Sequence, residues 1–221
     1  MTVDRRINKS KTALKEALLI LMENKDFNKI TITDIVNISN LNRGTFYKHY
    51  QTKEELLEDL IGEVIADLIL SYREPYLQKS KLEISDLSSS SIKIFEHVYL
   101  YGKFYKIIIH SNALPGFQSK ICQVLKNLVL QDLSTKNDLN KNINPEIFSS
   151  YFAYAIFGII VEWVDQNFSY TPTYMSEQLI KILSYTTIIT RGTAQFFENL
   201  SLTLFHFLLN LKHSSTVNVA T

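Results

Sequence analysis

The stretch KITITDIVNISNLNRGTFYKHYQTKEELL, Lys29 to Leu57, contains the signals for two short helices and the start of a third. Thr31 can cap a helix start, and Asp34, three residues later, can reach back to it or favour the positive end of the helix dipole. Asn40 tolerates the left-handed conformation that closes a helix and redirects the chain. We therefore expect the first short helix to begin after Thr31 and to end at Asn40.

The second short helix is expected to begin after Asn42, another good cap, and to run to about Tyr50. Its buried side would use Phe46 and Tyr50. The other side chains would point outward: Arg43, Gly44, Thr45, Tyr47, Lys48 and His49. Thr52 and Glu55 form a further capping pair, which opens a third helix. Two helices joined by a tight turn, the second basic on its outside, are typical of a helix-turn-helix.

Charge divides the chain into two parts. Residues 1–53, which we call the head, carry ten Lys and Arg against five Asp and Glu; the remainder carries 13 against 17. The formal net charge of +1 therefore combines +5 in the head with −4 elsewhere. This asymmetry favours a polyanionic partner for the head, although a merely solvated charged face is the alternative.

Beyond the quoted stretch, almost every segment has the periodicity of a helix. Pro75 is expected to end the helix that follows Thr52, and the polar run 77–91 to form a loop. Asn144 and Pro145 make a strong helix start, a cap followed by a first-turn proline. The further helices that this pattern predicts cover residues 11–22, 145–166 and 174–189. The predicted fold is all-α: a three-helix head and a C-terminal helical body, residues 54–190.

The residues Lys29 to Leu57 resemble the helix-turn-helix of the TetR/AcrR family of bacterial transcriptional regulators. The family usually has alanine and glycine at Ser39 and Asn40, and serine at Asn42, but turn and cap chemistry are kept. The segments FYKIII, from Phe104, and YAIFGIIVEWVDQNFSYTPTYMSEQL, from Tyr154, resemble the C-terminal domain of a subgroup associated with dihydroxyacetone kinase regulators. Some members of that subgroup act as coactivators, so the resemblance leaves repression unassured.

A helix fits the major groove, where its side chains meet base edges and phosphates. We expect Arg43 and Thr45 to contact base edges and Gly44 to let the backbone approach closely. The expected phosphate contacts are Tyr47, Lys48, His49, Lys53 and Thr33, with Asn42 at the start of the helix. Packing against a neighbouring helix is the alternative for Tyr47 and His49. Arg5, Arg6, Lys9 and Lys11 would form an arm along the DNA backbone or an ordinary frayed terminus.

In the resembled family the last two long helices pair with their copies in a dimer, which here implies residues 145–166 and 174–189, with Gly158 permitting close approach. A two-fold dimer implies an inverted-repeat operator in double-stranded DNA. The resemblance also implies a small effector in the body, of apolar or aromatic character. The plausible lining residues are Tyr99, Phe104, Phe117, Tyr154 and Phe157, for which an ordinary core is the alternative.

Other classes of function find little support. The sequence has no glycine-rich phosphate loop, nucleophile elbow or histidine–cysteine cluster, so we expect no enzymatic activity, cofactor or metal. One cysteine and a polar N-terminus predict a cytoplasmic protein. Residues 191–221 extend beyond the family pattern. Their apolar run 200–211 is too short for a membrane span, which leaves a packing helix, a membrane-surface or partner contact, or a poorly ordered end.

The predicted function is a DNA-binding transcriptional regulator, a repressor that binds a palindromic operator as a homodimer and is released by a small molecule. The alternative is a TetR-like coactivator or interaction protein that acts through another regulator and has little DNA affinity of its own. A gel-shift or footprint on the DNA upstream of its own gene, with the salt dependence measured, distinguishes the two.

Overall fold

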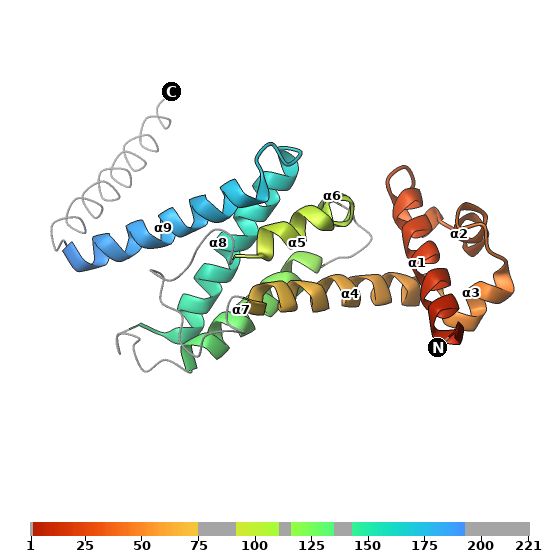
Figure 1. Cartoon of the computed structure of the whole chain (residues 1–221), viewed down its shortest axis with the longest axis horizontal. Helices are drawn as coiled ribbons and strands as arrows, with labels where there is room; N and C mark the ends of the chain where they lie inside the picture. The colour runs from red at the N-terminus through yellow and green to blue at the C-terminus, as the bar shows by residue number, and fades with distance from the viewer. Residues whose placement is uncertain (1, 75–91, 111–115, 135–142, 193–221) are drawn as a thin grey trace, which may run out of the picture.

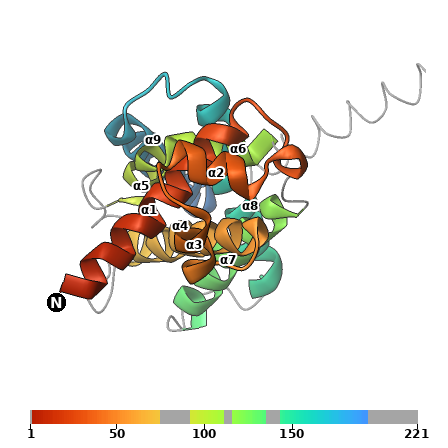
Figure 2. The same ribbon diagram turned by 90° about the vertical axis from the view of Figure 1, so that its right-hand side faces the viewer.

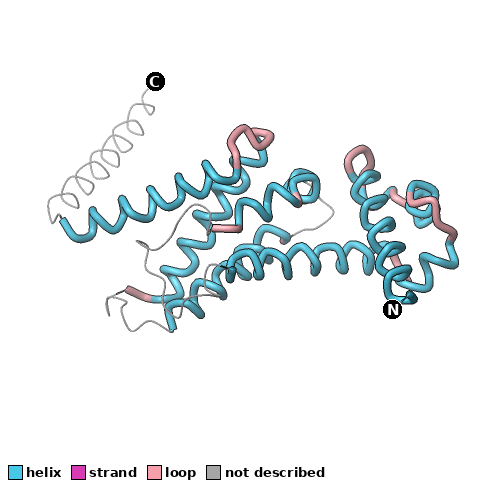
Figure 3. The backbone as a smooth tube through the Cα atoms, viewed as in Figure 1, coloured by secondary structure: helices cyan, strands magenta, loops and turns pink. Residues whose placement is uncertain are grey.

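The computed structural model describes residues 2–74, 92–110, 116–134 and 143–192. Within these ranges the regular elements are helices, and no strand is present (Figure 3). They are α1 (Thr2–Met22), the 3-10 turn η1 (Phe27–Lys29), α2 (Ile32–Ile38), α3 (Arg43–His49), α4 (Lys53–Arg73), α5 (Ile94–Leu100), α6 (Gly102–His110), α7 (Phe117–Ser134), α8 (Pro145–Asp165) and α9 (Pro172–Gly192). The predicted all-α fold is confirmed.

The head lies at one end of the molecule, and α4 leads from it into the body (Figure 1). Figure 2 looks onto the head end, with α2 and α3 toward the viewer. The apolar sides of the head helices meet in a small core in which every helix has at least one fully buried side chain, and α1 has two. These side chains are Leu14, Leu18, Ile35, Phe46 and Leu56. Because α4 contributes to both cores, the head and the body share one continuous helix.

The helix starts follow the local signals in the sequence. Thr31 and Asp34 form the reciprocal capping box: the Asp34 N–H donates to Thr31 Oγ1 at 3.2 Å, and the Thr31 N–H donates to Asp34 Oδ2 at 2.9 Å. The carboxylate also accepts from Lys25, and these bonds lower the Asp34 pKa to about 2. Asn40 has φ 54° and closes the turn after α2, as predicted. Asn144 caps α8, with Pro145 in its first turn.

The third capping pair differs from its prediction in one bond. The Glu55 N–H donates to Thr52 Oγ1 at 3.2 Å, as expected. The Glu55 carboxylate, however, accepts from the N–H of Gln51 at 2.7 Å. The Glu55 side chain therefore accepts from Gln51, the residue before the cap, and not from Thr52. The backbone amide of Gln51 lies in the link between α3 and α4.

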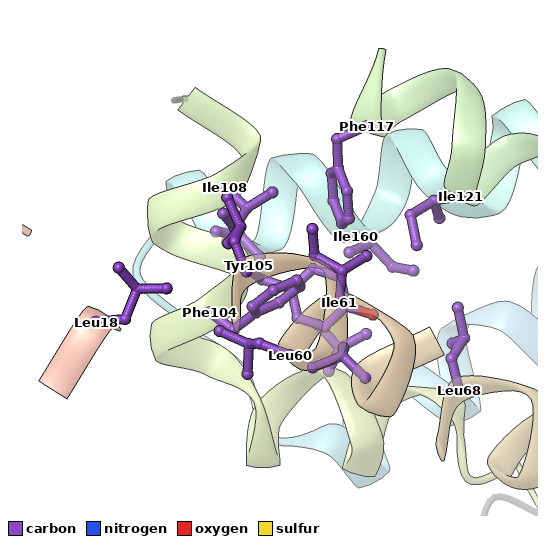
Figure 4. Packing of buried hydrophobic residues seen from close by; sticks show 14 of the residues in the cluster. Leu18, Leu60, Ile61, Leu68, Phe104, Tyr105, Ile108, Phe117, Ile121 and Ile160 are labelled. Atoms are coloured by element: carbon purple, nitrogen blue, oxygen red, sulfur yellow. The ribbon is translucent and has the colours of Figure 1, made fainter. Parts of the chain in front are cut away.

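The core of the body forms where α4, α6, α7 and α8 meet (Figure 4). Leu60 and Ile61 from α4 lie beside Phe104 and Tyr105 from α6, and Leu18 of α1 approaches the same side of α6. The helices α7 and α8 make the most extensive helix pair among the described residues. Since Leu18 belongs to the head, this contact joins the head to α6 directly as well as through α4.

The helical course of the chain breaks between α5 and α6, although the apolar pattern of this segment gives no sign of a break. Tyr101 ends α5, and α6 starts at Gly102. A Cβ built on Gly102 would lie 2.9 Å from Cε2 of Phe168, so only glycine leaves room for that ring. Phe168 comes from the turn between α8 and α9 and has φ 58°, the left-handed region that most residues avoid. A tertiary contact therefore fixes this break.

Other differences are at the ends of elements. The helix predicted over residues 11–22 begins earlier, at Thr2, and that predicted over 174–189 covers Pro172–Gly192. The loop predicted over 77–91 and the extension 193–221, including the run 200–211, lie outside the described residues.

The helix α8 has the length and mean hydropathy of a membrane span, the one such helix in the part of the chain that the structure describes. Length and composition are the whole basis of this resemblance to a membrane span, and the core helix of a soluble protein can have both. Its packing along α7 and its cap at Asn144 identify it as a helix of the body. One third of its most apolar stretch is buried within a single chain, so α8 keeps an exposed apolar face.

Candidate nucleic-acid interface

The helix α3 is held to the head by one aromatic side chain. Phe46 is its buried residue, and its ring makes an edge-to-face contact with Tyr47 and a tilted contact with Tyr50, which is also buried. The opposite side of α3 faces solvent: Arg43, Gly44, Tyr47 and Lys48 are exposed, and Thr45 and His49 are half-buried. The predicted division is therefore confirmed for buried Phe46 and Tyr50 and for outward Arg43, Gly44, Tyr47 and Lys48, whereas Thr45 and His49 are only partly outward.

The starts of α2 and α3 are joined by a side-chain hydrogen bond. The guanidinium of exposed Arg43 donates to Oγ1 of Thr33, in the first turn of α2. This bond brings a predicted base contact and a predicted phosphate contact together on one surface. The remaining N–H donors of the guanidinium stay available to a ligand, because Arg has five.

Asn42 acts first as a cap. Its Oδ1 accepts from the N–H of Thr45 at 2.7 Å and from Oγ1 of Thr45 at 3.1 Å. A Cβ on Gly44 would lie 3.2 Å from the same oxygen, so the glycine leaves this cap undisturbed. The hydroxyl of Thr45 is therefore used within α3, and its methyl group is the part suited to a base edge.

His49 lies against α1 rather than in open solvent. One of its ring nitrogens, Nε2, is 2.7 Å from Oγ of Ser10. Burial and then the charges of Lys11 and Lys48 lower the pKa of His49 below its ordinary value, so the neutral ring is favoured. This contact is the packing alternative for His49. Tyr47, by contrast, is exposed.

Lys53 has a different environment from the one that a phosphate contact would need. Its ammonium donates to three backbone carbonyls around η1, those of Phe27 at 2.8 Å, Asn28 at 3.1 Å and Ile30 at 2.9 Å. It also lies 4.7 Å from the centroid of the Phe27 ring. These three acceptors use all three donors of an ammonium group. The side chain therefore ties the start of α4 to the loop before α2.

Replacing Lys53 by glutamine should consequently affect stability more than DNA contact. Loss of hydrogen bonds from a charged donor is expected to lower the free energy of unfolding by about 1.5–3 kcal/mol, measured by urea denaturation. Lys48→Gln is the matched variant on the exposed side of α3. It should leave unfolding unchanged, weaken binding to all DNA sequences alike and reduce the salt slope by about 1. A Lys53→Gln protein of unchanged stability would contradict this assignment.

A charged network that was not predicted from the sequence ties the residue after α3 to α1 and α4. Tyr50 donates from its hydroxyl to Oδ2 of Asp59 on α4 at 2.6 Å, and the same oxygen lies 3.0 Å from Nζ of Lys15 and 3.4 Å from Nζ of Lys11. Lys15 also pairs with Glu63. The sequence does contain a signal for it. Lys11 and Lys15 are four residues apart on α1, and Asp59 and Glu63 are four residues apart on α4, so each pair lies on one side of its helix.

The pKa values of this network follow from its geometry. Burial alone would raise the pKa of Asp59, but hydrogen bonds from Tyr50 and Lys15 and the charges of Lys15 and Lys11 outweigh it and lower the pKa to about 2. Burial, with the hydrogen bond to Asp59, raises the pKa of the Tyr50 hydroxyl. Near neutral pH the carboxylate is therefore ionised and the phenol protonated, which is the combination that this hydrogen bond requires.

The five predicted effector contacts do not line one pocket. Phe104 and Phe117 pack against each other with ring centroids 5.7 Å apart, and Phe157 is buried with them in the core. Tyr99 and Tyr154 are more than half exposed. Tyr99 does line a hollow of about 740 Å³ at the junction of the head and the body. A second hollow, of about 520 Å³, lies between α8 and α9 and includes Gly158 and Tyr174.

Two family models match the chain. Residues 10–60 match "Bacterial regulatory proteins, tetR family", and residues 85–185 match "Transcriptional regulator C-terminal region", a TetR C-terminal domain. The regulator YxbF of Bacillus subtilis (strain 168), named as an HTH-type transcriptional regulator, is 27% identical over 82% of this chain. The chain spans about half the length of that relative, 46%.

A second relative is the HTH-type dhaKLM operon transcriptional activator DhaS of Lactococcus lactis subsp. lactis (strain IL1403). It is 23% identical over 77% of this chain and 86% of its own length. A solved structure of the dihydroxyacetone kinase operon activator DhaS has a TM-score of 0.59 and 20% identity, and covers 81% of this chain and 97% of that one.

Two further solved structures have the same fold. A TetR transcriptional regulator from Streptococcus agalactiae 2603V has a TM-score of 0.55 and 21% identity, and covers 82% of this chain and 97% of that one. A TetR-family regulator from Syntrophomonas wolfei str. Goettingen has a TM-score of 0.63 and 18% identity, with 85% and 98% covered. Since all these proteins are transcriptional regulators, the prediction that the chain is not an enzyme is confirmed. The chain belongs to the TetR family of bacterial transcriptional regulators.

Proposed function

We propose that this protein is a cytoplasmic DNA-binding regulator that reads an inverted-repeat operator as a homodimer. The observation that carries the proposal is the outward side of α3, where Arg43, Gly44, Tyr47 and Lys48 are exposed while Phe46 anchors the helix. Arg43 reads a base edge and Lys48 holds a phosphate. Thr33, Asn42, Thr45 and Tyr47 complete the interface, His49 packs against Ser10 at its edge, and Lys53 acts through its backbone amide at the start of α4.

The proposed dimer uses the uncovered sides of α8 and α9. On α8, Ile147, Tyr151 and Tyr154 follow helical spacing and are 70%, 66% and 54% exposed. Gly158 continues the stripe, and a Cβ built on it meets nothing within 4 Å, so a partner helix can approach there. Exposed Tyr174 and Ile182 lie on α9. Contiguous apolar surface of this kind is typical of an oligomer interface.

The sign of regulation proposed is repression, in which the bound dimer blocks access of other proteins to the operator. A second candidate, activation, is favoured by the relative DhaS, whose name describes a transcriptional activator. A reporter gene placed behind the upstream DNA of this gene separates them. Deletion of the regulator raises expression if it represses, and lowers expression if it activates.

The release of DNA by a small effector is also part of the proposal. The hollow at the junction of the head and the body supports it, because a ligand there would touch both.

Footprinting on the upstream DNA, with affinity measured over a range of salt concentrations, tests the proposed DNA binding. Two protected half-sites about 34–36 Å apart, from centre to centre, and an affinity that falls steeply with salt are expected. No protection, or equal affinity for a single half-site and a palindrome, would exclude this function and favour an interaction protein.

Arg43→Ala is expected to relax base preference at one position of each half-site by about 1–3 kcal/mol, measured by competition between operators with single base changes. Thr33→Val is the matched variant, because it removes the hydroxyl that Arg43 binds and leaves the guanidinium in place. It should keep the base preference. If both variants weaken every sequence equally, Arg43 only stabilises the turn and does not read a base.

A further inference from the structure

The hollow at the junction of the head and the body, which we call the junction hollow, has walls from four parts of the chain. Glu23 follows the end of α1, Tyr99 lies on α5, Lys103 and Lys106 lie on α6, and Asn167 and Phe168 form the turn after α8. Its volume of about 740 Å³ is in the range that holds a small organic molecule. None of the residues that face DNA in the proposed function belongs to it.

One wall of the junction hollow is aromatic. Tyr99 is 55% exposed, although its ring packs edge-to-face on Phe168 with centroids 5.6 Å apart. Phe168 in turn packs edge-to-face on Trp163 at 5.0 Å. The absence of a Cβ at Gly102 lets the Phe168 ring lie against α6. These contacts hold two rings in fixed positions at the edge of the junction hollow.

The junction hollow is also lined by two cations. Lys103 and Lys106 are three residues apart and so lie on one side of α6. Nζ of Lys103 is 3.1 Å from a carboxylate oxygen of Glu23. Lys106 donates to the side-chain oxygen of Asn167 and lies 5.2 Å from the centroid of the Phe168 ring. Its partner is thus a neutral amide, and a carboxylate would be a stronger one.

The turn after α8, which supplies Asn167 and Phe168 to the junction hollow, is in an unusual conformation. Asn167 and Phe168 are successive non-glycine residues with φ of 55° and 58°. Left-handed backbone is costly for a phenylalanine, and such strain tends to occur where the structure must aim a side chain. Here it directs the Asn167 amide toward Lys106 and the Phe168 ring toward Tyr99 and Gly102.

We infer that the junction hollow binds a small organic anion with an aromatic body, its carboxylate on Lys103 and Lys106 and its ring against Tyr99 and Phe168. The ligand carboxylate takes the place of Glu23 on Lys103. The effect on DNA binding rests on the proposed function. Glu23 directly follows α1 of the head, so the exchange breaks an ion pair between the head and the body and lowers operator affinity. Binding itself does not depend on DNA.

The chain contains one tryptophan, which gives a direct test. Trp163 touches Phe168, so its fluorescence should change when the full-length protein is titrated with phenylacetate. The change should be saturable. Phenylacetamide, the neutral counterpart with the same ring, should bind about tenfold or more weakly, since charged hydrogen bonds are about twice as strong as neutral ones.

Three substitutions at exposed positions distinguish the contribution of the Lys106 charge to phenylacetate binding from that of a surface charge elsewhere. Lys106→Gln should weaken phenylacetate about tenfold, since it removes a charge-assisted contact. Glu23→Gln should strengthen it, because the competing carboxylate is gone. Lys120→Gln, on α7 and outside the junction hollow, should leave it unchanged. No saturable change, equal binding of the two ligands, or equal affinity in all four proteins would overturn the inference.

A second measurement tests the coupling. Phenylacetate should lower the affinity for the operator, and operator DNA should lower the affinity for phenylacetate by the same factor. Phenylacetate binding that leaves operator affinity unchanged overturns the coupling to the head. A protein that binds phenylacetate as described but never binds DNA instead overturns the proposed function, so the two failures are distinguishable.

Discussion

Tyr151→Glu is expected to convert the proposed dimer into a monomer and to lower affinity for an inverted-repeat operator by a factor of about 10²–10⁴, the advantage that linking two binding modules commonly confers. Tyr151 is at the centre of the exposed stripe on α8, between Ile147 and Tyr154. A glutamate there would be buried without a partner in a symmetric interface, and two copies would face each other across the two-fold axis. An unpaired buried charge is strongly unfavourable, so association should fail.

Sedimentation velocity at micromolar concentration measures the oligomeric state, and gel shifts on one half-site and on the palindrome measure the two affinities. The half-site affinity should be unchanged, because Tyr151 belongs to α8, and α8 lies in the body, away from α3 (Figure 1). Tyr151→Phe should remain a dimer. Gln118→Glu adds the same charge to the exposed side of α7 and controls for net charge. A Tyr151→Glu protein that still sediments as a dimer would place the interface elsewhere.

The helix starts at Thr31, Asn42 and Asn144 could be predicted because each is decided by residues within one turn. Thr31 with Asp34, Asn42 with Thr45, and Asn144 with Pro145 all form the caps that their sequence indicates. The buried and exposed sides of α3 follow from its period in the same way. Such local signals survive folding because the same few atoms make the contact in any tertiary context.

Contacts between distant parts of the chain could not be predicted in this way. Lys53 binds carbonyls 23 to 26 residues away, and His49 binds Ser10, 39 residues away. The break before Gly102 depends on the ring of Phe168. In each case the side chain has a reasonable solvent-exposed alternative, and only the packing of the helices decides against it.

The predicted effector residues show a related limit. Aromatic side chains at helical spacing fit a core and a ligand pocket equally well, because both are apolar. Phe104 and Phe117 fill the core, whereas Tyr99 borders the junction hollow. What distinguishes Tyr99 is its neighbours Lys103 and Phe168, which come from other elements. Periodicity along the chain contains no information about that neighbourhood.

Phe46→Ala should unfold the head while the body stays folded. Truncating a buried phenylalanine costs about 3–5 kcal/mol, and a small core has little stability to spare. Phe46 is fully buried and is the one side chain of α3 itself that enters the head core. Its loss should release α3, and operator affinity should fall for every sequence alike, in contrast to the change in base preference expected for Arg43→Ala.

Two probes separate the head from the body in this variant. Far-ultraviolet circular dichroism follows all helices, whereas the fluorescence of Trp163 follows the body, in which that residue is buried. In Phe46→Ala part of the circular dichroism signal should be lost well below the temperature at which the fluorescence changes. Phe46→Leu leaves a smaller cavity, so the temperatures of its two transitions should lie closer together. If both probes instead report one shared transition, then α4 and the contact of Leu18 with α6 couple the head to the body strongly enough to unfold them as a single unit.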